Sequence, residues 1–396
     1  MTPGGRIAAA IEILDAVLAG ARADRTLAGW GRAHRFAGSK DRAAIADLVY
    51  AGLRRRRSLA HEAGAETGRG LMLALAAAEG RLAEFSGEGH APPPPTAAER
   101  AALARAEPPD EDVALDVPPA LADALRRSLG NRFAPVMAAM RERAPLDLRV
   151  NLMRITRAAA GRALAEEGIE TLPLEAEPAA LRVTEGAGRL RNSAAYRSGL
   201  VEIQDIGSQR AARLAEAQPG ETVLDFCAGG GGKTLALAMH MQGQGRLIAH
   251  DANPARMDQL AIRAVRAGVR VERMTPAQLR AASPVCDLVV ADLPCSGSGT
   301  WRRDPESKWR LDASALASLT GLQDRILDEA AGFVRPGGRL CAITCSLLDT
   351  ENEHRIAAFL RRRPDFATIR SQQLTPPSDG DGFFTCLLQR AAAAKG

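Results

Sequence analysis

The sequence predicts an α/β protein whose C-terminal part is a doubly wound, Rossmann-like sheet. Short apolar runs alternate there with helical stretches, which is the pattern of a parallel sheet built from βαβ units. The expected strands are 222–226, 246–250, 287–291 and 339–344. A glycine-rich turn follows the first strand, and a cysteine follows each of the last two. Because the carboxyl ends of parallel strands open into a ligand crevice, we expect a functional site at that edge.

Composition limits the class of protein. At 396 residues the chain is too long for one ordinary core, so we expect two or three domains. No apolar run reaches the length of a membrane span, and the N-terminus does not read as a signal peptide, so we expect a cytoplasmic protein. The six cysteines show no zinc-binding spacing, so we expect no metal. The net charge of +5 favours an anionic partner.

Helices are expected at the N-terminus. Apolar residues recur at helical spacing from Ile7 to Leu18, and a second stretch follows Asp41. That stretch ends in four consecutive arginines, Arg54 to Arg57. Such a run is either a solvated helix end or a phosphate contact, and both interpretations stay open. A further helix is expected over 71–89.

The prolines at 92–95 indicate an extended linker, after which the pattern mixes short strands and helices. Strands are expected over 148–152 and near 201–205, with a helix over 157–167. A late edge strand is expected over 382–388. The predicted domains are a helical domain over 1–88, a linker over 89–116, an α+β subdomain over 117–215 and a catalytic domain over 216–396.

The glycine-rich turn runs from Ala228 to Thr234. A P-loop needs a glycine where Cys227 stands, and the dinucleotide fingerprint needs one where Thr234 stands. What remains is a strand, a glycine turn and a helix, with Asp251 at the end of the next strand. A carboxylate at that position can accept hydrogen bonds from both hydroxyl groups of a ribose. This arrangement fits S-adenosylmethionine, with the aminoacyl part against the glycine turn.

Two cysteines lie directly after apolar strands, Cys295 in Asp-Leu-Pro-Cys-Ser-Gly and Cys345 in Thr-Cys-Ser. A free cysteine is most often a small buried hydrophobe. Here each thiol has turn-forming polar neighbours in place of a continuing apolar run. Two thiols at strand ends are therefore expected to take part in chemistry.

These motifs resemble those of the RsmB/Sun-type RNA cytosine-5 methyltransferases, over roughly 117–390. The matching segments are Leu224–Ala228, Gly231–Thr234, Asp292–Gly297, Arg335–Gly338, Thr344–Ser346 and Glu351–Glu353, together with Arg149–Asn151 and Gln204-Asp205. The resemblance implies a class I methyltransferase sheet preceded by a small RRM-like α+β subdomain. The N-terminal helices look like the family's NusB-like RNA-binding domain.

The resemblance also implies the roles of the site residues. Cys345 would attack C6 of cytosine, Cys295 would help remove the C5 proton, and Asp292 would bind the N3 edge. DNA cytosine methyltransferases, with their own Pro-Cys motif, suggest the reverse alternative, in which Cys295 is the nucleophile. The cofactor-binding residues would be Cys227, Ala228, Gly229, Gly230, Gly231, Gly232, Lys233, Asp251, Thr275 and Asp292. Gly230 stands where the family has proline, and Thr275 where it has an adenine-binding acid.

The implied partner is RNA with a cytosine in a single strand or loop, because the base must leave its stack to reach a thiol. By resemblance we expect ribosomal RNA of the small subunit, and we expect a monomer. The alternatives are a transfer-RNA methyltransferase and a non-catalytic RNA-binding protein. Side chains just after Cys295 either stack on RNA bases or belong to the core, and both possibilities stay open. They are Trp301, Arg302, Arg303, Trp309 and Arg310.

Overall fold

The computed structural model describes residues 1–105 and 107–393. It divides the chain into two compact units, which we describe separately. The first contains residues 1–143 together with 301–313, and the second contains 144–300 together with 314–396. The four predicted domains follow a finer division and remain a prediction.

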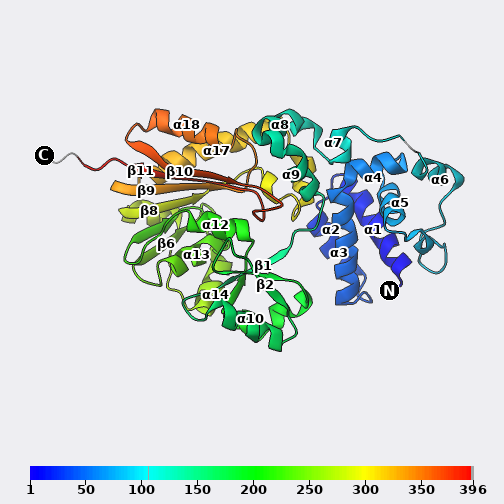
Figure 1. Ribbon diagram of the computed structural model, residues 1–396, viewed down its shortest axis with the longest axis horizontal. Coiled ribbons are helices and arrows are strands. Elements are labelled where there is room, and N and C mark those ends of the chain that lie inside the picture. Colours follow the sequence, from blue (N-terminus) through cyan, green and yellow to red (C-terminus); the bar gives the residue numbers. More distant parts are fainter. Residues whose placement is uncertain (106, 394–396) are drawn as a thin grey trace. The chain divides into compact units, whose positions relative to one another are not determined.

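The first unit is helical (Figure 1). Its helices are α1 (Pro3–Leu18), α2 (Ala23–Ala33), α3 (Ser39–Arg54), α4 (Arg56–Ala63), α5 (Gly68–Ala78), α6 (Ala97–Leu103), α7 (Glu111–Ala114), α8 (Ala122–Leu129), α9 (Phe133–Met140) and α16 (Pro305–Arg310). The Thr2 hydroxyl caps α1 by accepting from the Gly5 amide. The apolar stripe of α1 is buried, with Ile7 and Leu14 at 1% and 0% exposure. The helix predicted over 71–89 ends at Ala78, and Gly80 follows it with a φ of +68°.

The segment 301–313 packs within this helical unit, far in sequence from its neighbours. Trp301 is fully buried, and the Trp309 indole donates to the Leu53 carbonyl over 2.7 Å. Arg310 donates to the carbonyls of Gly20 and Ala21. Trp301 is therefore a core residue and cannot stack on a base, while Trp309 and Arg310 hold the segment in place.

The second unit contains a small antiparallel sheet with strand order β2-β3-β1-β4. Its strands are β1 (Leu146–Val150), β2 (Thr171–Pro173), β3 (Ala180–Val183) and β4 (Val201–Ile203). The helices that accompany it are α10 (Arg157–Glu166), α11 (Ala194–Arg197) and α12 (Ile206–Arg213). The strands and the helix predicted in this region are confirmed to within a few residues.

The large sheet has seven strands in the order β10-β11-β9-β8-β5-β6-β7. They are β5 (Thr222–Asp225), β6 (Arg246–His250), β7 (Glu272–Met274), β8 (Cys286–Asp292), β9 (Val334–Thr344), β10 (Phe366–Leu374) and β11 (Phe383–Arg390). The five from β9 to β7 are parallel, whereas β10 and β11 are antiparallel to their neighbours. The helices are α13 (Gly232–His240), α14 (Asp258–Ala267), α15 (Pro276–Ala282), α17 (Ala313–Ala331) and α18 (Glu353–Arg362).

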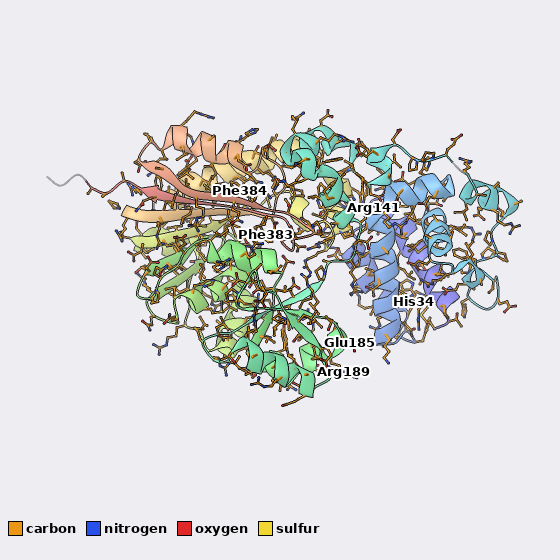
Figure 2. All side chains as sticks on the ribbon, viewed as in Figure 1. His34, Arg141, Glu185, Arg189, Phe383 and Phe384 are labelled. Atoms are coloured by element: carbon orange, nitrogen blue, oxygen red, sulfur yellow. The ribbon has the colours of Figure 1, made fainter. Side chains whose placement is uncertain are left out.

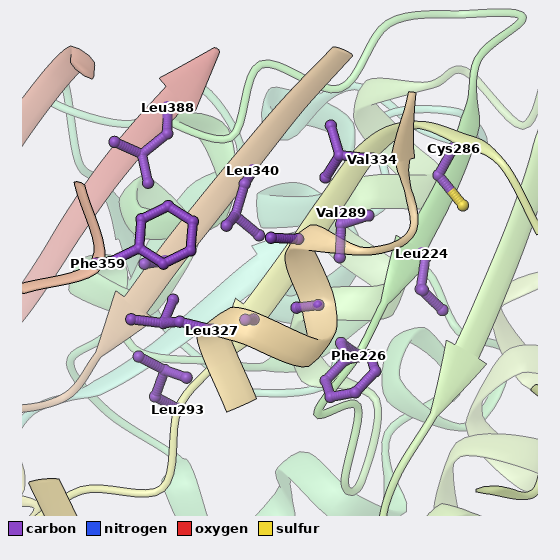
Figure 3. Close-up of a cluster of buried hydrophobic side chains, with 14 of the residues drawn as sticks. Leu224, Phe226, Cys286, Val289, Leu293, Leu327, Val334, Leu340, Phe359 and Leu388 are labelled. Atoms are coloured by element: carbon purple, nitrogen blue, oxygen red, sulfur yellow. The ribbon is translucent and has the colours of Figure 1, made fainter. Parts of the chain in front are cut away.

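Both faces of this sheet are covered, because successive strand residues point to opposite sides. One apolar cluster joins the sheet to α17 and α18 through Leu327 and Phe359 (Figure 3). Another joins the opposite face to α12 and α13. The adjacent residues Phe383 and Phe384, labelled in Figure 2, belong to different clusters. Each fully buried Leu or Phe contributes roughly 1.5–3 kcal/mol, so these clusters hold the strand ends rigidly.

A strand over 382–388 is confirmed, but the prediction that it lies at the edge of the sheet is wrong. That segment is β11, which lies between β9 and β10, and β10 is the edge. The strand β10 has no apolar run that would predict it, because five of its nine residues are exposed, as expected of an edge strand. In the described residues no helix combines the length and apolar character that crossing a bilayer requires.

Candidate active site

The glycine turn at the end of β5 is held by two hydrogen bonds, one with β6 and one with β1. Gly229 and Gly231 have φ values of +48° and +81°, a conformation that other residues adopt at a cost. The Ala228 amide donates to the His250 carbonyl over 2.8 Å. The Arg149 guanidinium of β1 donates to the Gly232 carbonyl over 2.8 Å. The small sheet thus supports the turn that begins α13.

Asp251 lies buried beneath this turn, as its position after β6 predicted. One of its oxygens accepts from the Gly229 amide over 3.0 Å, and the other accepts from the Asn253 amide over 2.9 Å. Arg256 pairs with the same carboxylate at 3.2 Å. The Oδ1 oxygen accepts from Asn253 alone and has a second lone pair, so it can still accept a hydrogen bond from a ribose hydroxyl while Asp251 shapes the turn.

Asp225, the last residue of β5, was missed as a site residue. It is fully buried, and one oxygen accepts from the Thr234 hydroxyl over 2.6 Å. The other oxygen, Oδ1, is buried without a hydrogen-bond partner. Burial raises the pKa of Asp225 to about 7. A buried carboxylate oxygen without a partner, next to the glycine turn, fits a ligand that carries hydrogen-bond donors. The ammonium and hydroxyl groups of S-adenosylmethionine are such donors.

Three other predicted cofactor residues, Thr275, Cys227 and Gly230, take part in local structure. Thr275 caps α15, accepting from the Gln278 amide over 3.3 Å. Burial raises the pKa of the Cys227 thiol, which therefore stays protonated in the turn. The carbonyl of Gly230 accepts from Arg263 over 2.5 Å. The assignment of Thr275 to adenine remains a prediction.

The two thiols predicted for chemistry lie together. The Sγ atoms of Cys295 and Cys345 are 3.4 Å apart. Their loops follow β8 and β9, which are neighbouring parallel strands, so both strand ends reach the same edge. The Gly299 amide donates to the Cys345 carbonyl over 2.9 Å and joins the two loops. Tertiary pairing thus brings both sulfurs within reach of one substrate atom or its neighbour.

The two thiols differ in acidity. The hydrogen bond from Cys295 lowers the pKa of Cys345 below its ordinary value; burial and Asp292 act against this shift, and Lys233 adds to it. The same hydrogen bond, burial and the Glu351 carboxylate raise the pKa of Cys295. Because the thiolate is the nucleophilic form of cysteine, this difference favours the prediction that Cys345 is the nucleophile.

The buried Lys233 and the partly exposed Asp292 form an ion pair beside the thiols. The Lys233 ammonium lies 2.7 Å from Asp292 Oδ2 and 4.9 Å from the centre of the Phe383 ring. Although burial lowers the pKa of Lys233, Asp292 raises it more, so the lysine stays charged. The ion pair uses only Oδ2 of Asp292, and the Asp292 side chain is 33% exposed, so Oδ1 can take another partner. A polar edge of a bound base can reach that oxygen.

A buried carboxylate joins the two thiol loops. Glu351 is 1% exposed and accepts from the Ser296 amide over 2.8 Å. It also accepts from the hydroxyl groups of Ser296 and Ser346, the latter over 2.5 Å, and from Gln323 over 3.0 Å. Ser296 follows Cys295 and Ser346 follows Cys345, so one side chain fixes both loops. Only the Glu351–Glu353 motif signalled this residue in the sequence.

The fold and this site define a class. A seven-stranded sheet that carries a glycine turn after β5, an acid after β6 and reversed β11 is the sheet of the S-adenosylmethionine-dependent class I methyltransferases. S-adenosylmethionine is accordingly the cofactor of this domain, as predicted, and Asp225, Asp251 and the glycine turn are the residues that fit it. Among the described residues, no cluster of His, Cys, Asp and Glu could hold a metal ion.

Comparison with known sequences gives the family. Residues 212–388 match the sequence model described as 16S rRNA methyltransferase RsmB/F. Residues 117–188 match the ferredoxin-like domain of RsmF/B-like methyltransferases, which confirms the predicted α+β subdomain. The two matches together cover more than half of the chain, so the chain belongs to the RsmB/F methyltransferase family.

Curated relatives agree with this assignment. A probable ribosomal RNA small subunit methyltransferase B of Synechocystis is 32% identical over 58% of this chain and 53% of its own length. The ribosomal RNA small subunit methyltransferase B of Klebsiella pneumoniae is 32% identical over 66% of this chain and 63% of its own length. The matched part of the chain thus spans between about half and two thirds of the length of these relatives.

Solved structures show the fold alone. The structure titled "Crystal Structure of PH0851" has a TM-score of 0.75 at 23% identity and covers 98% of this chain and 99% of its own. NSun6 from Pyrococcus horikoshii, solved with SFG, has a TM-score of 0.62 at 18% identity over 70% of this chain and 99% of its own. The NusB-like character of the N-terminal helices remains a prediction.

Proposed function

We propose that this protein methylates C5 of a cytosine in RNA, most directly in ribosomal RNA of the small subunit, through a covalent bond between Cys345 and C6. The observation that carries the proposal is the 3.4 Å contact between the Cys295 and Cys345 sulfurs beside the Lys233–Asp292 pair. The small-subunit target comes from the printed names of the relatives. A transfer-RNA target is the alternative.

The chemistry begins with a poor nucleophile, the C5 atom of cytosine. The Cys345 thiolate forms a bond to C6, the C5–C6 double bond opens, and C5 gains enamine character. The proton that leaves the Cys345 thiol passes to N3, and the Asp292 carboxylate accepts a hydrogen bond from the new N3–H group, so that the ring does not build up a full negative charge. Lys233, paired with Asp292, keeps that carboxylate in place.

S-adenosylmethionine, when bound at the glycine turn, supplies the electrophilic methyl group for C5. Release then requires the C5 proton. Cys295, once its own proton has passed to solvent, accepts the C5 proton as a thiolate. The electron pair then restores the C5–C6 double bond, the bond from C6 to the Cys345 sulfur breaks, and N3 returns its proton to the Cys345 thiolate. A raised pKa makes the Cys295 thiolate a strong base, whereas the lowered pKa of Cys345 suits attack and departure.

The test is methyl transfer from labelled S-adenosylmethionine to small-subunit RNA, with bisulfite sequencing to locate 5-methylcytosine. Transfer RNA is the parallel substrate. Label in small-subunit RNA supports the proposal, and label in transfer RNA alone supports the alternative. A protein that binds RNA and transfers no methyl group to either would be a non-catalytic RNA-binding protein, which both intact thiols argue against.

A further inference from the structure

A set of side-chain amides behind the active site holds the loop that carries Cys345, and the proposed reaction does not use it. Asn352, the residue before α18, is fully buried. Its Oδ1 atom accepts from the Thr344 hydroxyl over 2.6 Å, and its Nδ2 atom donates to the Ser346 carbonyl over 3.0 Å. Thr344 and Ser346 flank Cys345, so one amide holds both neighbours of the proposed nucleophile.

Gln373 on β10 holds Asn352 in turn. Its Oε1 atom accepts from Asn352 Nδ2 over 2.9 Å. The Nε2 atom of Gln373 donates to the carbonyls of Ser346 and Phe383, each over 3.2 Å, and to the Leu374 carbonyl over 3.1 Å. Two amide hydrogens are thus shared among three acceptors. Gln373 therefore ties the loop after β9 to the start of β11.

The start of β11 supports the other half of the site. The Phe383 ring, labelled in Figure 2, has its centre 4.9 Å from the Lys233 ammonium, which pairs with Asp292 at 2.7 Å. A cation over an aromatic face is attracted to it, and the attraction grows where water is excluded. The contacts of Gln373 thus reach the Cys345 loop on one side and, through Phe383, the Lys233–Asp292 pair on the other.

We propose that Gln373 is a positioning residue for methyl transfer, which sets the Cys345 sulfur against Cys295 and against the ion pair. This inference rests on the proposed function, because that function gives Cys345 the attack on C6. The 3.4 Å contact between the two sulfurs depends on where their loops lie. Without the donors of Gln373, the carbonyls of Ser346 and Phe383 lose a shared partner and the loop can shift. A displacement of about 1 Å at a reacting group can cost on the order of 10²-fold in rate.

Gln373→Met keeps the length of the side chain and removes its donors, and Gln372→Met is the matched control. Gln372 is the neighbouring residue of β10, so its side chain points to the opposite face of the sheet. Gln373 is partly buried on an edge strand, so the variant should fold, and Gln373→Ala is a second variant without a long side chain.

Three measurements compare these proteins with wild type. Alkylation by iodoacetamide across a range of pH, followed by peptide mass spectrometry, reports the ionisation of Cys345. Single-turnover methyl transfer to RNA reports the chemical step. Urea titration reports the free energy of unfolding, so that a loss of stability can be told apart from a change at the thiol.

We expect both Gln373 variants to move the midpoint of Cys345 alkylation up by about one pH unit. The reason is that a longer contact with Cys295 raises the pKa of Cys345 toward its ordinary value. Single-turnover methyl transfer should fall at least ~10-fold, and Gln372→Met should match wild type in both measurements.

Equal alkylation profiles for Gln373→Met and Gln372→Met would overturn the proposal, even if Gln373→Met were less stable, since Gln373 would then have a structural role alone. Alkylation needs neither RNA nor methyl donor. A wild-type protein that transfers no methyl group therefore fails the proposed function, while the alkylation profile still decides whether Gln373 positions Cys345.

Discussion

Cys345 and Cys295 are fifty positions apart in sequence, yet their sulfur atoms lie 3.4 Å from each other. At that distance the two thiols share a hydrogen bond, so the first ionisation of the pair produces one thiolate that the other thiol stabilises. The hydrogen bond from Cys295 favours that thiolate at Cys345, whereas burial and the Glu351 carboxylate raise the pKa of Cys295. This difference in pKa supports the proposed roles of the two cysteines.

The first prediction separates the two roles. Cys345→Ala should reduce methyl transfer by ~10³-fold or more and form no covalent RNA adduct, because the attacking group is lost. Cys295→Ala should still attack and methylate, then accumulate a protein–RNA species, because the C5 proton stays in place. A denaturing gel with labelled RNA makes the comparison. A trapped adduct in Cys345→Ala and none in Cys295→Ala would reverse the assignment.

The second prediction concerns Glu351, which bonds to both thiol loops. Glu351→Gln keeps the size of the side chain but removes the charge that helps to raise the pKa of Cys295. Alkylation of Cys295 by iodoacetamide, followed by peptide mass spectrometry, should then begin at lower pH than in wild type. Glu353→Gln, an exposed acid two positions on, is the control. An unchanged pH profile in Glu351→Gln would leave Glu351 with a packing role alone.

The third prediction concerns the cofactor. In wild type, the backbone amides of Gly229 and Asn253 donate to the two oxygens of Asp251. Asp251→Asn replaces one of these oxygens by an NH₂ group, which cannot accept, and a hydrogen bond to a carboxylate is worth ~1.5–3 kcal/mol. We expect affinity for S-adenosylmethionine to fall about tenfold to a hundredfold, measured by calorimetry. Asp258→Asn, an exposed acid at the start of α14, should bind like wild type. Equal binding by both variants would remove Asp251 from the cofactor site.

The fourth prediction concerns stability and pH. Burial lowers the pKa of Lys308 from 10.5 to about 7 in the folded chain. Between these values the unfolded chain binds the extra proton, so the contribution of Lys308 to stability is full above pH 10.5 and is lost as pH falls through about 7. Lys308→Met should flatten the rise in unfolding free energy from pH 7 to 10 and be at least as stable as wild type at pH 7.

Tryptophan fluorescence can follow this unfolding, because the three tryptophans, Trp30, Trp301 and Trp309, all lie in the helical unit. Urea titrations at pH 7 and pH 9 give the two free energies. The exposed Lys40, changed to Met, is the matched control and should keep the wild-type pH dependence. A Lys308→Met variant that keeps the full rise with pH would show that another group is responsible.

Local patterns in the sequence predicted four of the five parallel strands of the large sheet, and β7 was not predicted. Apolar runs of strand length predicted β5, β6, β8 and β9, since a strand buried on both faces must be apolar throughout. They also predicted where the glycine turn, Asp251 and the two cysteines would gather, because ends of parallel strands share one edge. The run of glycines in the sequence already indicated a turn with positive φ angles, and Gly229 and Gly231 adopt such angles.

Tertiary structure alone decided which groups meet. β10 was missed because an exposed edge strand needs no apolar pattern, and Arg54 lies buried because residues 301–313, far along the chain, pack in its unit. Distant segments also meet in the 3.4 Å contact of the thiols and in the contacts of Glu351. Only the folded structure shows that Oδ1 of Asp225 is buried without a partner. Propensity and periodicity act over a few neighbouring residues, whereas burial, pKa and hydrogen-bond partners depend on what the folded chain brings alongside.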